Sequence, residues 1–185
     1  MTLRKVNSIV TMGIMVLFLV HMIWGILILT GMTKGGSNVF SVFSYMLMVL
    51  IAVHVLIGIK LTIDTIIAAK KSHVFYWREN SLFLLRRISG FALLLFILAH
   101  VIVLKGKSVN GSFRLPFFDE MALASQILMV LSLLVHLATN IKPLKIALGF
   151  SDKHNLRTDI GLVLAILLFL SGIAFVIYFI RWQVI

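Results

Sequence analysis

The sequence contains no cysteine, only two prolines and only six acidic residues among 185. Without cysteine, the chain forms no disulfide, binds no iron–sulfur cluster through thiolates and attaches no haem covalently in the c-type manner. Charged residues make up 12% of the chain, about half of their usual share in a soluble domain. Any cofactor must therefore be held by ligands other than cysteine. The chain also has few ionic side chains.

Hydrophobic residues are correspondingly abundant in the sequence. They make up 61% of the chain, and the mean hydropathy is +1.12. This composition excludes a soluble globular domain and predicts an integral membrane protein. The formal net charge of +11 does not indicate nucleic-acid binding, because the basic residues lie in short runs between apolar segments, where they act as topology signals and contact lipid headgroups.

Five apolar runs are long enough to cross a bilayer, which takes about 20 residues. Only a helix satisfies its own backbone hydrogen bonds within lipid, so we predict an all-α fold, a polytopic bundle of five transmembrane helices. No link between the runs is large enough for another domain, and residues 1–185 are predicted to form one transmembrane domain. The expected helices are about 8–32, 39–67, 88–104, 121–141 and 159–180.

Lysine and arginine are distributed unequally between the two sides of this predicted bundle. The N-terminus and the second and fourth links hold eleven of them, and the opposite side holds five. By the positive-inside rule the N-terminus is cytoplasmic and the C-terminus lies outside. The first run is too long for a signal peptide, and we interpret it as an uncleaved span. We expect a multi-pass protein of the bacterial inner (cell) membrane.

Histidine follows a regular pattern. Two of the six histidines fall in the cytoplasmic links, and each of the first four apolar runs carries one. A single membrane histidine often only bonds neighbouring helices, but an ionisable residue in each of four consecutive spans indicates function. Neutral imidazole is the usual axial ligand of haem iron. The candidate metal ligands are His21, His54, His100 and His136.

The depth of the first two ligands follows from the nearest cytoplasmic charges. His54 precedes Lys60 by six residues, and His136 precedes Lys142 by six. At 1.5 Å of rise per residue both lie about 9 Å from the cytoplasmic boundary. This estimate takes Lys60 as the boundary, since taking Lys70 would leave Lys60 within the lipid.

The other two ligands lie deeper. His100 follows Arg87 by thirteen residues, and His21 follows Lys5 by sixteen, which places both about 20 to 24 Å from the same boundary. The four histidines therefore form two levels with two members each. We predict two stacked b-type haems, the inner one between His54 and His136 and the outer one between His21 and His100.

Cations and glycines near these levels suit such cofactors. Gly25 and Gly58 lie one turn beyond two of the ligands, where a porphyrin could approach the backbone. The cations placed to meet haem propionates are Lys60, Arg86, Arg87 and Lys142 at the inner edge and Lys34, Lys105 and Lys107 at the outer edge. The alternative interpretation of each cation is a topology anchor that snorkels to the interface.

The segment RRISGFALLLFILAH, Arg86 to His100, adds a more specific signal. With its R-x-S-G opening and the four-histidine register, the chain resembles the dihaem cytochrome b membrane anchor of succinate dehydrogenases and fumarate reductases. The resemblance implies the same ligand pairing. It also implies electron transfer between membrane quinone and an iron–sulfur subunit on the cytoplasmic face, which is bound to a flavoprotein subunit. This chain would be the membrane subunit of that enzyme.

A quinone site is less clearly indicated. Asp119 and Glu120, before the fourth run, are candidates for an outer, menaquinone-type site; the alternative is that they are helix N-terminal acids favoured by the macrodipole. Arg87 and Ser89 are candidates for an inner site. Asp64 is the only acid in the first four runs, which argues against a transmembrane proton path.

Two other functions are compatible with the sequence. Cytochrome b anchors of other quinone-linked oxidoreductases often carry two histidines about thirteen residues apart on one helix, a spacing that no apolar run here contains. A haem-free transporter or assembly protein would use its histidines for packing or proton relay. The quinone type, the direction of electron flow and a dimer of complexes are left open.

Overall fold

The computed structural model describes residues 2–35, 37–72, 77–109, 112–115, 118–148 and 154–184. Helices dominate this part of the chain, as the all-α prediction requires. The helices are α1 (Leu3–Leu29), α2 (Asn38–Ser72), α3 (Trp77–Val103), α4 (Glu120–Leu148) and α5 (His154–Val184).

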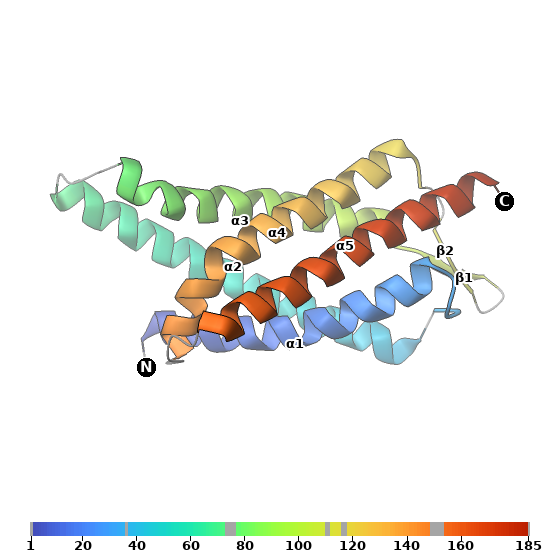
Figure 1. The fold of residues 1–185 in the computed structure, drawn as a ribbon, viewed down its shortest axis with the longest axis horizontal. Helices are drawn as coiled ribbons and strands as arrows, with labels where there is room; N and C mark the ends of the chain where they lie inside the picture. Colours follow the sequence, from blue (N-terminus) through green and yellow to red (C-terminus); the bar gives the residue numbers. More distant parts are fainter. Residues whose placement is uncertain are drawn as a thin grey trace.

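The helices run alternately up and down the bundle (Figure 1). We call one end the basic end; α1, α3 and α5 begin there and α2 and α4 finish there. The opposite, hairpin end carries two short strands, β1 (Lys107–Val109) and β2 (Ser112–Arg114), which pair antiparallel. At the basic end α2 and α3 project beyond the other helices (Figure 1).

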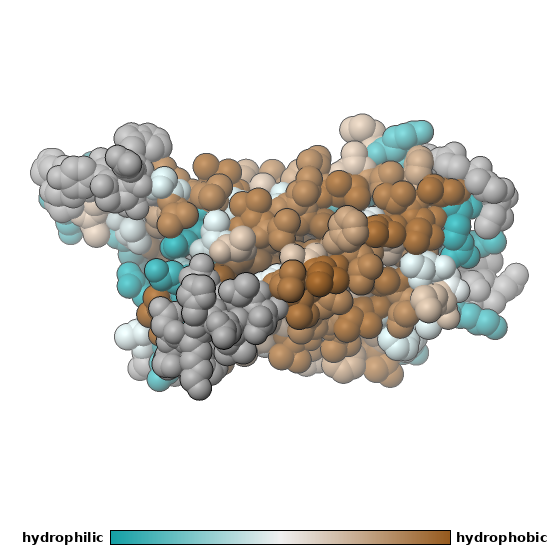
Figure 2. Space-filling model, in the orientation of Figure 1, coloured by the Kyte–Doolittle hydropathy of each residue, from teal (hydrophilic) through white to brown (hydrophobic). Residues whose placement is uncertain are grey.

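All five helices are long and apolar enough to cross a membrane. Many of their large apolar side chains are exposed, and Figure 2 shows apolar side chains covering the middle of the bundle, with hydrophilic ones toward its ends. Such a surface requires lipid around it. The prediction of a multi-pass membrane protein with five helices is therefore confirmed.

The helices are longer than the apolar runs. Helix α2 continues to Ser72 and α3 begins at Trp77, whereas the sequence predicted bounds of 67 and 88. Helix α4 passes through Pro143, beyond its predicted last residue 141. An apolar run marks only the part of a helix that lies in lipid, and helical hydrogen bonding continues past that depth.

Two helix pairs form the frame of the bundle. Helix α1 packs along α2, and α3 packs along α4. Gly13 of α1 allows a close approach, since a Cβ there would lie 3.1 Å from Leu50 Cδ1 of α2. Helix α5 packs against both α1 and α4 and so joins the pairs. Among the described residues, α2 packs closely only against α1, which leaves a space between the two pairs.

The densest packing lies at the hairpin end, where α5 meets the segment before α4. Leu115 and Phe118 are both 1% exposed, and the ring of Phe118 meets that of Tyr178 edge-on at 5.3 Å. The backbone N–H of Leu115 donates to the Tyr178 hydroxyl at 3.1 Å. This core closes the hairpin end and fixes the start of α4.

A proline accounts for the contact that holds α3 to α4 at the basic end. Pro143 has no N–H, so the Thr139 carbonyl four residues earlier loses its helical partner. The Arg86 Nε atom donates to that carbonyl at 3.0 Å. Arg86 therefore satisfies the backbone group that Pro143 leaves unpaired.

We predict that Arg86→Met lowers the free energy of unfolding by about 1 to 3 kcal/mol, because a hydrogen bond from a charged donor is lost and a carbonyl is left unpaired. The loss should be clearly smaller in a Pro143→Ala background, where the backbone N–H of the introduced alanine restores the helical bond. Thermal unfolding of the four proteins in detergent measures the coupling. Equal losses in both backgrounds would contradict this role of Arg86.

Candidate functional site

A long cavity occupies the space between the two helix pairs. Its volume is about 2050 Å³, and it extends from Thr2 and Lys145 at the basic end to Lys105 at the hairpin end. Side chains from all five helices line it, and they are mainly apolar. All four histidines that the sequence singled out are among the lining residues: His21, His54, His100 and His136.

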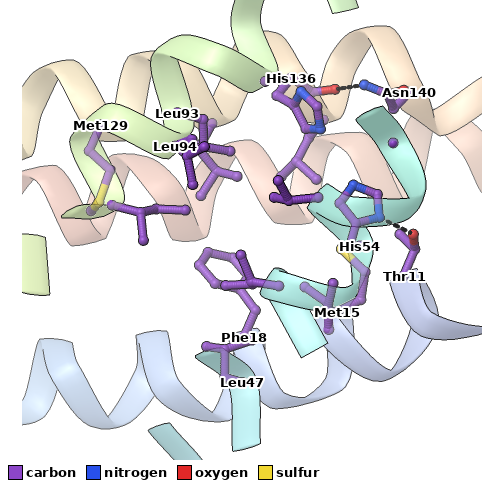
Figure 3. A pocket seen from close by; sticks show the side chains of 18 of the residues that line it. Thr11, Met15, Phe18, Leu47, His54, Leu93, Leu94, Met129, His136 and Asn140 are labelled. Carbon is purple, nitrogen blue, oxygen red and sulfur yellow. Dashed lines mark hydrogen bonds between the residues drawn. The ribbon is translucent and has the colours of Figure 1, made fainter. Parts of the chain in front are cut away.

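The first pair of histidines lies toward the basic end. Figure 3 shows His54 from α2 and His136 from α4 facing each other across the cavity. The Nδ1 atom of His54 lies 3.3 Å from Thr11 Oγ1, and that of His136 lies 3.2 Å from Ser89 Oγ. Gly90 packs closely against His136, since a Cβ on Gly90 would lie 3.2 Å from its Cε1 atom and would displace the ring by a few tenths of an ångström.

The second pair lies toward the hairpin end. The ring centroids of His21 and His100 are 6.0 Å apart, with an interplanar angle of 64°. The Nδ1 atom of His21 lies 3.1 Å from Ser44 Oγ, and that of His100 lies 2.8 Å from Gln126 Oε1. The structure therefore brings together the same two pairs that the depth estimate predicted.

The partners of Nδ1 fix the tautomer of each ring. A hydroxyl has one proton, and those of Thr11, Ser44 and Ser89 all donate it to a carbonyl of their own helix, at 2.8, 3.0 and 3.2 Å. When these hydroxyls donate to their own carbonyls, each oxygen accepts from the histidine Nδ1–H, as the amide oxygen of Gln126 does for His100. In that arrangement all four rings carry the proton on Nδ1, and the Nε2 lone pair is available to a ligand.

Each histidine is held by the helix that packs against its own. Thr11 of α1 holds His54 of α2, and Ser44 of α2 holds His21 of α1. The second pair repeats this exchange, because Ser89 of α3 holds His136 of α4 while Gln126 of α4 holds His100 of α3. The holding residue precedes the histidine of its own helix by ten residues in α1, α2 and α4, and by eleven in α3. Ten residues of helix span about 15 Å, which is therefore the separation of the two levels.

Three of these four holding residues were not identified from the sequence. Thr11, Ser44 and Gln126 were overlooked, and Ser89 was noted only as a candidate quinone residue. The overlooked signal is a polar residue ten or eleven positions before each histidine. The two helices of a pair run antiparallel, and their histidines lie at different levels. A polar residue ten or eleven positions before the histidine of one helix therefore lies beside the histidine of the other helix.

The charges along the cavity have one sign. No aspartate or glutamate lines it within the described residues. Arg87, one of the predicted cations, has its guanidinium 4.9 Å from the centroid of the Phe83 ring, and its buried Nε has no hydrogen-bond partner among the described residues. The lining cations are Arg4, Lys5, Arg86, Arg87, Lys105, Lys142 and Lys145.

Three predicted site residues lie away from the histidine pairs and do not line the cavity. Lys60 is exposed and forms an ion pair with Asp64 at 2.7 Å. Asp119 caps α4, because its Oδ1 accepts from the Ala122 N–H at 2.8 Å, and Glu120 is an exposed residue of the first turn. Both acids therefore occupy the helix N-terminal positions that were the alternative interpretation of this pair.

Comparison with protein-family models, curated proteins and solved structures found no match for this chain.

We predict that the four membrane histidines of the cofactor-free protein are neutral Nδ1–H tautomers. Nitrogen-15 NMR of histidine-labelled protein distinguishes the two ring nitrogens. Ser44→Ala removes the acceptor of His21 and should change the signals of that ring alone, whereas Ser41→Ala, one turn away, should change none. An Nε2–H tautomer at His21 in the native protein would contradict the assignment.

Proposed function

We propose that this chain is a dihaem cytochrome b that carries electrons through the membrane. The observation that carries the proposal is the locked histidine set, with four imidazoles in two facing pairs around one cavity and each Nε2 left free. Neutral imidazole with its second nitrogen bonded to a protein acceptor is the usual form of a metal ligand. A role in packing alone would not require all four lone pairs to be left unused.

The size of the cavity and the spacing of the rings suit two haems. A single-ligand pocket typically measures about 300 to 1,000 Å³, so a cavity of about 2050 Å³ has room for two large cofactors. Two imidazoles on opposite sides of one metal ion, with metal–nitrogen bonds of about 2 Å, have ring centres about 6 Å apart. The centroids of His21 and His100 are 6.0 Å apart.

Two glycines provide flat surface where a porphyrin would lie. A Cβ built on Gly25 or Gly58 meets nothing within 4 Å, and both residues line the cavity. Gly25 lies one turn from His21, and Gly58 one turn from His54. Each level therefore has open backbone next to a ligand, as the sequence suggested.

The charge of the cavity also fits haem. Haem propionates are anionic, and the charged side chains that line the cavity in the described part of the chain are all cations, which provide charge-assisted partners at both ends. Of the predicted partners, Arg86, Arg87 and Lys142 line the basic end and Lys105 lines the hairpin end. Lys60 is engaged with Asp64 and is not part of this set.

When bound, haem supplies reversible one-electron chemistry at its iron. The four histidines would hold two such centres at levels about 15 Å apart along the helices. Thr11, Ser44, Ser89 and Gln126 keep the four rings oriented, and the apolar lining excludes water from the path. By the positive-inside rule the basic end is the cytoplasmic one, where an electron-transfer partner would dock.

We infer that quinone is the membrane substrate and that its headgroup binds near the basic end. Arg87 Nε is a buried donor and Asn7 Oδ1 a buried acceptor, neither paired among the described residues, and both residues line the cavity. Quinone accepts hydrogen bonds and quinol donates them. The N-cap role of Asp119 makes the hairpin-end acids weaker candidates for this headgroup.

The resemblance of RRISGFALLLFILAH to the anchors of succinate dehydrogenase and fumarate reductase supports a specific assembly. In that assembly an iron–sulfur subunit and a flavoprotein subunit dock on the basic, cytoplasmic end. The chain would be the quinone-linked membrane subunit of a succinate:quinone oxidoreductase. An anchor of another quinone-linked complex is the alternative with the same cofactors.

Single substitutions of the ligands test the proposal. His136→Ala and His54→Ala should each remove the same haem, and His21→Ala and His100→Ala should each remove the other, because each pair shares one iron. Reduced-minus-oxidised spectra with haem quantification measure the loss. His154→Ala, outside the four ligands, is the control that should keep both. Absence of haem from the native chain would reject the proposal.

Filling the cavity next to a ligand is a second test. Gly58→Leu and Gly25→Leu should leave the thermal unfolding temperature of the cofactor-free protein nearly unchanged, because the added side chain enters open space. Each should lower haem content by about one haem per chain. Gly161→Leu also enters open space but lies outside the cavity, and it should retain both haems. Full haem content in all three variants would show that the cavity is not the haem site.

A further inference from the structure

We propose that Gln126 is a positioning residue that makes the hairpin-end ligand His100 electronically different from the other three histidines. The inference rests on the proposed haem function and deepens it, because it assigns to one residue the difference between the two haem sites. For three histidines the partner of Nδ1 is a hydroxyl oxygen, and among the four only His100 has an amide oxygen as that partner.

The contact with Gln126 is the shortest and most enclosed of the four. The distance from His100 Nδ1 to Gln126 Oε1 is 2.8 Å, whereas the three hydroxyl contacts measure 3.1 to 3.3 Å. Gln126 is 0% exposed and is the only one of the four holding residues that is fully buried. A buried amide has no water to replace a lost partner, so its oxygen is committed to His100.

A chain of hydrogen bonds fixes the orientation of the amide. The Gln126 Nε2 atom donates to Ser125 Oγ at 2.9 Å, and Ser125 donates its own proton to the Ala122 carbonyl at 2.7 Å. The Ala122 N–H donates in turn to Asp119 Oδ1 at 2.8 Å. With Ser125 donating to the Ala122 carbonyl, its oxygen accepts from the amide nitrogen, and Oε1 faces His100.

This arrangement affects the iron through the ring. An amide oxygen is a stronger acceptor than an alcohol oxygen whose lone pairs compete with its own donated bond. A stronger acceptor at Nδ1 increases the basicity of the opposite nitrogen and strengthens its bond to iron. A more basic ligand favours ferric over ferrous iron, so the Gln126 contact lowers the reduction potential of the hairpin-end haem.

The test uses the full chain, purified with its haems, in redox titrations followed by absorbance and by electron paramagnetic resonance. Gln126→Leu removes the acceptor, and Gln126→Glu keeps an oxygen at the same place. Ser89→Ala is the matched control, because it removes the acceptor of His136 at the other haem. The two haems serve as internal references for each other.

We expect Gln126→Leu to raise the potential of one haem by about 59 mV, the equivalent of a tenfold change in the ferric-to-ferrous preference. Ser89→Ala should move the other haem, and Gln126→Glu should not raise either potential. Selective loss of one haem in Gln126→Leu, with retention in Gln126→Glu, also supports the proposal, because lost second-sphere contacts reduce metal affinity by about 10 to 100-fold.

Three results would overturn the proposal. These are unchanged potentials and spectra in Gln126→Leu, equal changes at both haems, and identical behaviour of the Leu and Glu variants, which would indicate packing alone. Failure of the haem function itself is distinguishable, since the native chain would then contain no haem. In that case nitrogen-15 NMR of the cofactor-free protein still shows whether His100 keeps its Nδ1–H tautomer in native protein and loses it in Gln126→Leu.

Discussion

The interaction on which the site depends is the hydrogen bond from a histidine Nδ1 to a polar side chain on the adjacent helix. Each bond is part of an exchange, because the two helices of a pair hold each other's histidine. Such a bond is made only when two helices are in register and close together, so the packing of α1 on α2 and of α3 on α4 orients the four histidines. Helix packing and histidine orientation therefore depend on the same contacts.

The division of the bundle into two pairs explains the cavity. Each pair is close-packed within itself, and α5 joins the two along one side, while the opposite sides of α2 and α3 border open space. A membrane bundle has little hydrophobic driving force to close such a space, because lipid and helix faces are equally apolar. A large cofactor bound at both levels would fill it and connect the pairs through the metal. Arg86, bonded to the Thr139 carbonyl freed by Pro143, and the core around Phe118 hold the two ends in place without it.

Much of this architecture could be predicted from the sequence. The apolar runs identified all five helices, and the spacing of the four histidines from the nearest lysine or arginine gave the two levels, because helical rise converts position into depth. The ends of α2 and α3 were missed, since polarity limits only the segment in lipid. The β1–β2 hairpin and the exchange of holding residues were also missed, because they depend on which helix is adjacent to which, and hydropathy contains no information about neighbours. The sequence alone provides no reason to single out Gln126, because its role follows from its position beside His100 in the fold.

The proposed function depends above all on four locked imidazoles binding two irons in pairs. Electron paramagnetic resonance of the oxidised native chain, together with haem quantification, tests this binding most directly, because low-spin signals report two axial nitrogen ligands on each iron. We predict two haems per chain and two distinct low-spin ferric signals of bis-histidine type, with no high-spin signal. A single haem, or high-spin iron with an open coordination position, would contradict the pairing of the four histidines.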